Sequence, residues 1–342
     1  MTPCNELIGQ PCFFPEIRST IMPIDKEHFI KLSGHVGFFP HTTNIGVIAT
    51  EKKVYIIDSG TCTEDGNEIC KAVKDLFPEK KLSVILNTHA HSDHTGGNAE
   101  IIRETEDCEI WASFKESRVM DFPESMIVLY YGAAPFKELS ELSFSLQEGS
   151  SATRILKEET IEIEDGITIE CFSLSGHYFE QLGYLVHDGR DGKSSFFLGD
   201  SCFGIRMLKK YWIPFMIDPL RFRDSIKKIE SIPADFYIPS HGDCMEGDTI
   251  QAVAEMNIIV TLETETLILN VLKKAELTHE EVVEAVADYA GLEMKLGQFV
   301  LIGSTIKSYL SSLYDRGLVS FRMDSNRMLW RATEAAYEWQ TV

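Results

Sequence analysis

The first third of the chain alternates short apolar runs, rich in β-branched and aromatic residues, with longer segments of mixed polarity. Residues 45–57 predict two strands joined by a polar turn, and residues 64–77 predict a helix. The apolar run at 82–87 is too short for a typical helix and predicts a buried strand. A helix at 98–107 and a strand at 108–113 follow. This alternation of strand and helix indicates an α/β fold.

The pattern changes at about residue 114. Residues 114–155 are aromatic, contain methionine and proline, and do not alternate like a strand, so we expect an insertion of helices and loops. Strands return at 166–176 and at 182–200, and the second of these segments predicts a hairpin. One more strand is expected at 235–243. We therefore expect a first domain over residues 1–247.

Helical spacing dominates the remaining residues, 248–342, which we expect to form a second, mostly helical domain. The expected elements are three helices and a hairpin, at 249–275, 278–291, 299–317 and 318–333. The second helix begins at a capping box formed by Thr278 and Glu281. This order of elements is typical of a winged helix. Apolar residues cover more than one face of the long helix, which predicts packing on the first domain or on a second chain, as in a homodimer.

The charge of the chain limits its partners. The 342 residues include 53 acidic and 32 basic side chains, for a formal net charge of −21. Such a charge repels polyanions, so neither nucleic acid nor a membrane is expected as a partner, and a small-molecule substrate is favoured. No apolar run approaches the ~20 residues of a membrane span. The eight cysteines form no C-x-x-C pair, which together with the absence of a leader pattern favours a reducing, cytoplasmic compartment.

The segment NTHAHSDHTGGN, residues 87–98, concentrates ionisable side chains between a predicted strand and a predicted helix. His89 and His91 are two positions apart and project to the same side of an extended segment. Asp93 and His94 are adjacent, so a turn into the helix is needed to bring both to one place, and we expect the two glycines of the segment to permit it. Imidazole nitrogens and carboxylate oxygens are ligands of zinc and iron.

Three more candidate ligands follow predicted strands. His177, Asp200 and His241 each stand directly after one, at the edge where an α/β sheet collects its functional groups. Taken alone, each of them would be interpreted as an ordinary loop residue. Together with the four candidates in residues 87–98 they make seven possible ligands, which predict a metal centre. The remaining histidines lack this placement and are interpreted as structural, with His41 a pocket candidate beside Asn44; they are His28, His35, His41, His187 and His279.

These motifs, in this order and preceded by YIIDSG at 55–60, resemble the metallo-β-lactamase superfamily. The resemblance implies a four-layer αββα fold over about residues 35–243. It also implies one metal at His89, His91 and His177, a second metal at Asp93, His94 and His241, Asp200 as a bridge, and Asp58 as a support behind the ligands. Two divalent ions are expected, first of all Zn²⁺, although Fe and Mn accept the same ligands.

The implied function is a metal-dependent hydrolase in which a hydroxide of the dinuclear centre cleaves a small ester, thioester, lactone or related substrate. Asp93 is then the catalytic residue that orients the hydroxide or takes its proton. Two alternatives stay open: a nucleic-acid phosphodiesterase of the ribonuclease type, and a mononuclear iron oxygenase of the persulfide dioxygenase type. The second alternative does not use the complete second ligand set.

Departures from the family pattern bear on the substrate. Tyr178 follows His177 where a small hydroxyl residue is frequent, which disfavours a glutathione thioesterase. Tyr130 and Tyr131, in the aromatic insertion, are the other candidate substrate-binding residues. Cys202 and Cys244 stand close to ligands in the sequence and are interpreted as small core residues, with catalysis or metal binding as the alternative.

Overall fold

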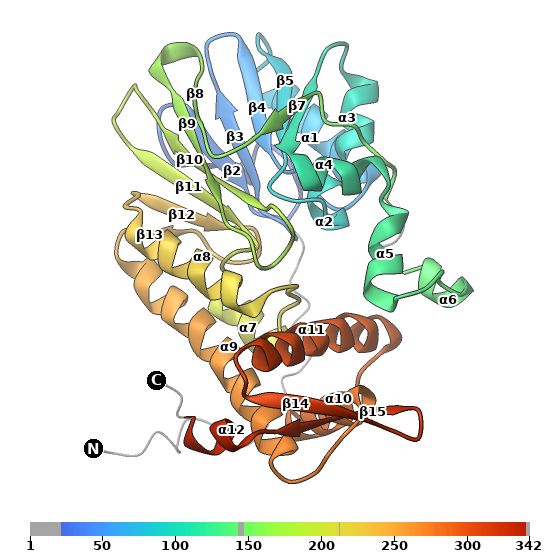
Figure 1. The fold of residues 1–342 in the computed structure, drawn as a ribbon. Helices are drawn as coiled ribbons and strands as arrows, with labels where there is room; N and C mark the ends of the chain where they lie inside the picture. Colours follow the sequence, from blue (N-terminus) through green and yellow to red (C-terminus); the bar gives the residue numbers. More distant parts are fainter. Residues whose placement is uncertain (1–21, 143–146, 212, 340–342) are drawn as a thin grey trace.

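The computed structural model describes residues 22–142, 147–211 and 213–339 (Figure 1). Cys4 and Cys12, the start of the chain and residues 143–146 of the expected insertion lie outside the described residues. No described helix is long and apolar enough to cross a membrane.

The first sheet has seven strands in sequential order. They are β1 (Ile30–Lys31), β2 (Val36–Phe39), β3 (Ile45–Ala49), β4 (Lys53–Ile57), β5 (Lys81–Leu86), β6 (Glu109–Ser113) and β7 (Arg154–Leu156). Neighbours from β1 to β4 pair antiparallel, and those from β4 to β7 pair parallel. The expected pair of strands at 45–57 is confirmed as β3 and β4. The expected insertion is wrong at its end, because residues 154–156 form the edge strand β7.

The second sheet has six strands in the order β13-β12-β11-β10-β9-β8. They are β8 (Thr160–Glu162), β9 (Thr168–Ser173), β10 (Leu182–His187), β11 (Ser194–Gly199), β12 (Phe236–Pro239) and β13 (Met245–Glu246). The expected hairpin is confirmed as β10 and β11, which pair antiparallel. β12 pairs parallel with β11, so its carboxyl end lies beside that of β11.

Helices cover the outer faces of both sheets. Those of the first domain are α1 (Thr63–Leu76), α2 (Ser92–Thr95), α3 (Asn98–Glu104), α4 (Phe114–Asp121), α5 (Glu124–Tyr131), α6 (Lys137–Ser140), α7 (Ile205–Tyr211) and α8 (Pro219–Ser231). The expected insertion is confirmed as helical over α4, α5 and α6. α8 was not predicted, although Asp218 caps it and Pro219 occupies its first turn.

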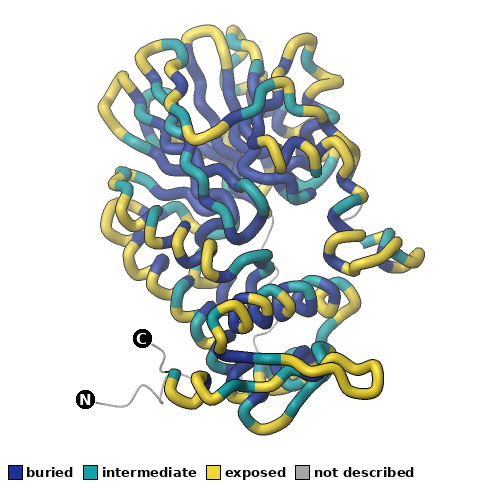
Figure 2. The backbone as a smooth tube through the Cα atoms, in the orientation of Figure 1, coloured by how far each residue is buried: buried dark blue, intermediate teal, exposed yellow. Residues whose placement is uncertain are grey.

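Three buried clusters account for the layers. One lies between the sheets and joins Tyr55 and Trp111 of the first to Tyr184 and Phe197 of the second. A second packs the other face of the first sheet against helices, with Ile56 and Ile69 as members, and the third packs the outer face of the second sheet against α8 and α9. Figure 2 shows the two sheets as the buried interior. The arrangement is a mixed α/β sandwich with four layers.

The C-terminal residues form α9 (Thr249–Leu272), α10 (His279–Tyr289), α11 (Leu296–Asp315), the hairpin β14 (Val319–Asp324) and β15 (Arg327–Ala332), and α12 (Glu334–Glu338). The capping box of Thr278 and Glu281 is present. α9 lies between α8 and α10, which explains why more than one of its faces is apolar. One buried cluster contains both Phe222 and Tyr309, so the core continues across the expected boundary at residue 247. The winged-helix identity stays a prediction.

Candidate metal centre

Strand order brings the expected ligands together at one edge of the sandwich. β4 and β5 pair parallel, so Asp58 and His89 follow neighbouring strand ends. The short helix α2 then presents Asp93 and His94. The two glycines after it are needed for close approach rather than for an unusual turn, because both have ordinary helical φ values. A Cβ atom on Gly96 would lie 2.2 Å from the carbonyl carbon of Thr61, and one on Gly97 would lie 2.3 Å from the carbonyl oxygen of Ser59.

The first ligand group consists of three imidazoles. Nδ1 of His91 lies 2.9 Å from Nε2 of His89 and 2.9 Å from Nε2 of His177. His89 is fully buried and His177 is 3% exposed. Burial, followed by the neighbouring imidazoles, holds the pKa of His89 and of His91 well below the usual range. These rings are therefore neutral at pH 7, which is the state that coordinates a metal ion.

The second ligand group is more acidic and more open. Nε2 of His241 lies 3.0 Å from an Asp93 carboxylate oxygen, and Nε2 of His94 lies 3.8 Å from the same oxygen. Burial would lower the pKa of His94, but the carboxylates of Asp58, Asp93 and Asp200 outweigh it and raise the pKa to about 10. The Asp93 side chain is 31% exposed, whereas that of His94 is fully buried. The centre therefore opens towards solvent on the side of Asp93.

Asp200 lies against both groups. One of its oxygens is 3.4 Å from Nε2 of His177 and 3.4 Å from Nε2 of His241, and the other is 3.4 Å from Nε2 of His94. The three buried atoms Nε2 of His91, Nε2 of His94 and Oδ1 of Asp200 have no hydrogen-bond partner among the described residues. Buried polar atoms rarely stay unpaired, and these belong to metal-ligating residue types. The donor set thus fits metal ions, and all seven expected ligands take part.

The surrounding chain anchors the outward nitrogens of His94, His177 and His241. Nδ1 of His94 lies 2.8 Å from Asp58, whose carboxylate also accepts hydrogen bonds from the amide and hydroxyl groups of Thr88. Nδ1 of His177 donates to the carbonyl oxygen of Phe215 at 2.8 Å, and Nδ1 of His241 donates to that of Thr42 at 2.8 Å. Such partners fix the ring so that the inner nitrogen faces a metal ion.

The backbone of Asp58 has a φ of 61°, a value that residues other than glycine seldom adopt. Its carboxylate is 1% exposed and lies behind His94, where the resemblance placed it. Strained backbone of this kind gathers at functional sites.

Two groups that hold the ligand segments in place were not predicted from the sequence. The buried carboxylate of Glu116 accepts hydrogen bonds from the Ala90 amide at 3.0 Å and the Glu180 amide at 2.7 Å, so it ties the His89 to His91 segment to the loop after His177. Burial raises the pKa of Glu116 to about 7. Glu116 was assigned no role from the sequence. The other group is the Phe215 carbonyl, which no side-chain pattern reveals.

The three candidate substrate tyrosines are placed differently. The ring centroid of Tyr178 lies 4.4 Å from that of His91, and the centroid of Tyr130 lies 6.3 Å from it. Both tyrosines are buried. Tyr131 is 41% exposed and packs its ring on Phe136, so the structure does not bring it to the ligands.

The other histidines and the two cysteines lie outside the ligand groups. Each of these histidines has a protein partner: His28 binds Asp25, His35 binds Asp188, His41 binds the Met22 carbonyl and Asp65, His187 binds Glu170, and His279 binds the Gly303 carbonyl. Asn44 donates to the carbonyl groups of Pro239 and Gly242. Burial raises the pKa of Cys202 to about 12 and that of Cys244 to about 11, so both remain thiols at neutral pH.

Comparison with known proteins agrees with this geometry. Residues 39–178 match the family model described as the metallo-beta-lactamase superfamily. These residues form a metallo-β-lactamase superfamily domain. The fold of the chain also has structural neighbours. A beta-lactamase domain protein from Burkholderia ambifaria has a TM-score of 0.68 at 14% identity, covering 94% of this chain and 97% of that protein. A metallo-beta-lactamase family protein from Thermus thermophilus has a TM-score of 0.63 at 15% identity, covering 90% of this chain and 97% of that protein.

One curated relative of the chain is the atrochrysone carboxyl ACP thioesterase of Passalora fulva. It is 22% identical over 227 residues, which are 66% of this chain and 56% of that relative. The chain thus matches little more than half the length of the relative. The prediction of an enzyme of the metallo-β-lactamase superfamily is confirmed at this level.

Proposed function

We propose that this chain is a hydrolase that holds two divalent cations, one at His89, His91 and His177 and one at Asp93, His94 and His241. The observation that carries this proposal is the position of Asp200, whose two oxygens lie 3.4 Å from nitrogens of both groups. A carboxylate in that position would help to hold both cations. Zn²⁺ is the first candidate, and Fe and Mn suit the same donors.

Some residues of the centre would bind the cations, and Asp93 would also orient the attacking water. The cations, when bound, polarise the substrate and lower the pKa of water towards ~7. Asp93 is the proposed catalytic residue, since its partly exposed carboxylate faces solvent and also contacts the Thr43 hydroxyl at 3.5 Å. Burial would raise the pKa of Asp93, but His94 and His241 outweigh it and hold the pKa well below its usual range. The ionised carboxylate can then orient water or accept its proton.

A small ester, thioester or lactone is the proposed substrate class. The thioesterase name of the Passalora fulva relative supports hydrolysis at an acyl group. Aromatic rings border the first ligand group, with the centroids of Tyr178 and Phe215 at 4.4 and 5.5 Å from that of His91. An acyl chain or ring bound beside His91 would meet an apolar wall there.

Charge disfavours the nucleic-acid alternative. The net charge is −21, and the three arginines of the C-terminal hairpin are already paired: Arg322 and Arg331 with Glu276, and Arg327 with Glu281. The oxygenase alternative uses one metal and gives no reason for the complete second group. No observation favours either alternative over hydrolysis.

We further propose that residues 248–342 form a winged-helix-like region that walls the centre. Val300 of α11 belongs to the same buried cluster as Tyr130 and Tyr178. Thr305 accepts a hydrogen bond from the Met216 amide at 3.4 Å, next to the Phe215 carbonyl that anchors His177. Through these contacts α11 would hold the wall beside the first ligand group. A cytoplasmic location and a homodimer remain predictions.

The test is a substrate panel on protein loaded with zinc, and separately with manganese or iron. The panel contains an acyl thioester, an aryl ester, a lactone and bis-p-nitrophenyl phosphate, each measured with and without a chelator. We expect chelator-sensitive turnover of at least one acyl substrate that exceeds phosphodiester turnover. Exclusive phosphodiester cleavage, or oxygen consumption with a persulfide and no hydrolysis, would overturn the proposal.

A further inference from the structure

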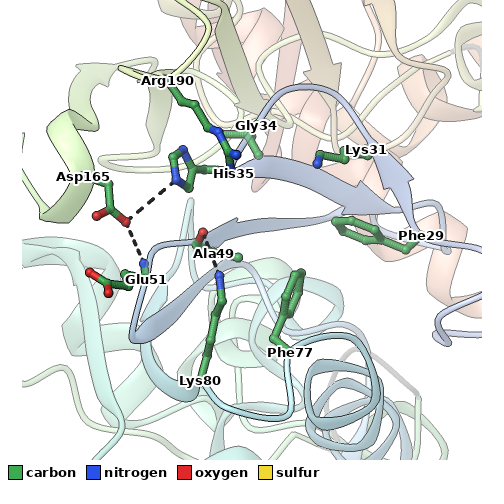
Figure 3. A pocket seen from close by; sticks show the side chains of 11 residues that line it. Phe29, Lys31, Gly34, His35, Ala49, Glu51, Phe77, Lys80, Asp165 and Arg190 are labelled. Atoms are coloured by element: carbon green, nitrogen blue, oxygen red, sulfur yellow. Dashed lines mark hydrogen bonds and ion pairs between the residues drawn. The ribbon is translucent and has the colours of Figure 1, made fainter.

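Figure 3 shows a hollow of about 350 Å³ in the first domain. It lies at the end of the sandwich opposite the metal ligands. Its walls come from the turns before β2, between β3 and β4, and between β10 and β11, together with Phe29 and the residues after α1. Ala49 at the wall ends β3, whereas Asp58 and His89 follow the other ends of β4 and β5. We call this feature the Arg190 hollow. It shares no residue with either ligand group.

Three cationic side chains border the Arg190 hollow without an ion pair to any described carboxylate: Lys31, Lys80 and Arg190. Every other arginine in the described ranges forms an ion pair. Carboxylates are abundant in a chain with 53 acidic residues, so an arginine without one is exceptional here. In Figure 3, Arg190 and Lys31 lie on one side and Lys80 on the other. The space between them is favourable for an anion.

The acidic residues of the hollow are placed apart from these cations. Asp165 and Glu51 lie together at one end in Figure 3. The Asp165 carboxylate already accepts a hydrogen bond from the Glu51 amide at 2.6 Å and faces Nε2 of His35 at 3.8 Å. The two carboxylates therefore leave the rest of the hollow to the three cationic side chains.

Aromatic rings supply an apolar surface beside the cations. The partly buried rings of Phe29 and Phe77 meet edge to face at 6.1 Å, and the Lys80 ammonium lies 5.4 Å from the Phe77 centroid. The stem of Arg190 rests on Gly34, where an added Cβ would lie 2.8 Å from the Arg190 Cδ. The backbone amide of Arg190 donates to Asp188 at 3.0 Å. These contacts position the backbone and the stem of Arg190 at the rim of the hollow, and its exposed guanidinium is free to meet an anion.

We propose that the Arg190 hollow binds a small organic anion with a flat apolar body, such as an aryl sulfonate, carboxylate or phosphate. The anionic group lies between Arg190 and Lys80, and the apolar body lies on Phe29 and Phe77. This site is separate from the metal centre and does not depend on the proposed reaction.

Isothermal titration calorimetry with benzenesulfonate on the metal-loaded protein tests the proposal. Benzyl alcohol supplies the ring without the charge, and sulfate supplies the charge without the ring. We expect benzenesulfonate to bind with a Kd below about 1 mM, and both comparison compounds to bind at least about tenfold more weakly. Equal binding of sulfate and benzenesulfonate would contradict the apolar part of the site.

Variants locate the binding. Arg190→Gln removes the charge at the rim and should raise the Kd about tenfold, while Arg331→Gln, a change on the distant hairpin, should leave it unchanged. Thermal unfolding of both variants should match the parent protein. An unchanged Kd in Arg190→Gln would refute the site. A Kd that changes in Asp93→Asn but not in Arg190→Gln would place the anion at the metal centre instead.

Discussion

The two ends of the β-sandwich each hold a buried aspartate beside histidine, Asp200 at one and Asp188 at the other, and they differ in how completely the polar atoms are hydrogen-bonded. At one end Asp200 lies among three histidines, and neither its Oδ1 nor the facing Nε2 of His94, 3.4 Å away, has a hydrogen-bond partner among the described residues. At the other end Asp188 is fully satisfied. It accepts hydrogen bonds from the Ser33 hydroxyl, the His35 amide and ring, and the Arg190 amide, at 2.6 to 3.0 Å.

Residue type alone therefore does not identify a metal site. A buried carboxylate whose lone pairs are all used by the chain stabilises the fold. A buried carboxylate and imidazoles that keep unpaired atoms directed at one point are prepared for a cation.

Asp200→Asn should abolish most activity and lower the occupancy of both metal sites. The substitution removes the negative charge of a ligand that both sites share. We expect transition-state stabilisation to fall by several kcal/mol as a result, which corresponds to a decrease of ~10³-fold in kcat/KM. Elemental analysis and steady-state kinetics measure the two effects. Retention of both cations with normal turnover would contradict the role of Asp200.

Asp93→Asn should depress turnover while leaving the free energy of unfolding nearly unchanged. The amide oxygen can still ligate, but the charge that orients water is gone, and a general base contributes ~10²-fold or more. Denaturant titration serves as the control for folding. If the variant keeps full activity with its second cation bound, Asp93 does not have the assigned role.

Asp58→Asn should weaken the second group selectively. His94 loses the anionic partner of its Nδ1, and partners of this kind contribute ~10- to 100-fold to metal affinity. Chelator competition measures the affinities of the two groups. Asp65→Asn is the matched control, because that carboxylate binds His41 instead. Equal weakening by both variants would indicate a general loss of packing.

Asp188→Asn should lower stability without changing metal content or turnover. Burial would raise the pKa of Asp188, but His35, Ser33 and the backbone amides outweigh it and lower the pKa to about 2 from an ordinary 3.8. The ionised carboxylate therefore stabilises the fold above about pH 4, by about 2 kcal/mol, and this contribution is lost as the pH falls through 2.

Denaturant titrations of wild type and Asp188→Asn at pH 7 and at pH 3 check the sign. The difference in unfolding free energy should be smaller at pH 3. If the difference in unfolding free energy grows on acidification, or if the variant loses metal, Asp188 does not have the purely stabilising role assigned to it.

The sequence was informative where a pattern is local. The spacing of His89, His91, Asp93 and His94 lies within one segment, and His177, Asp200 and His241 are each marked by the strand before them. Strand and helix periodicity likewise located most elements, because burial on one face repeats along the chain.

Contacts between distant segments could not be predicted in the same way. Asp188 and His35 are 153 residues apart, and neither stands in a motif. Nothing in the sequence around Glu116 indicates that it is buried, because the loop after His177 that covers it is distant in the sequence. Tyr130 and Tyr131 are neighbours in an apolar run with no polar face, so only the packing of α5 decides that one is buried and the other exposed.

The metal content of the purified protein tests the central claim most directly. The chain should be supplied with excess zinc, desalted and analysed for metal and protein in the same sample. Two ions per chain are predicted, since two ligand groups share Asp200. A ratio of one that persists under excess zinc, manganese or iron would contradict the two-cation hydrolase.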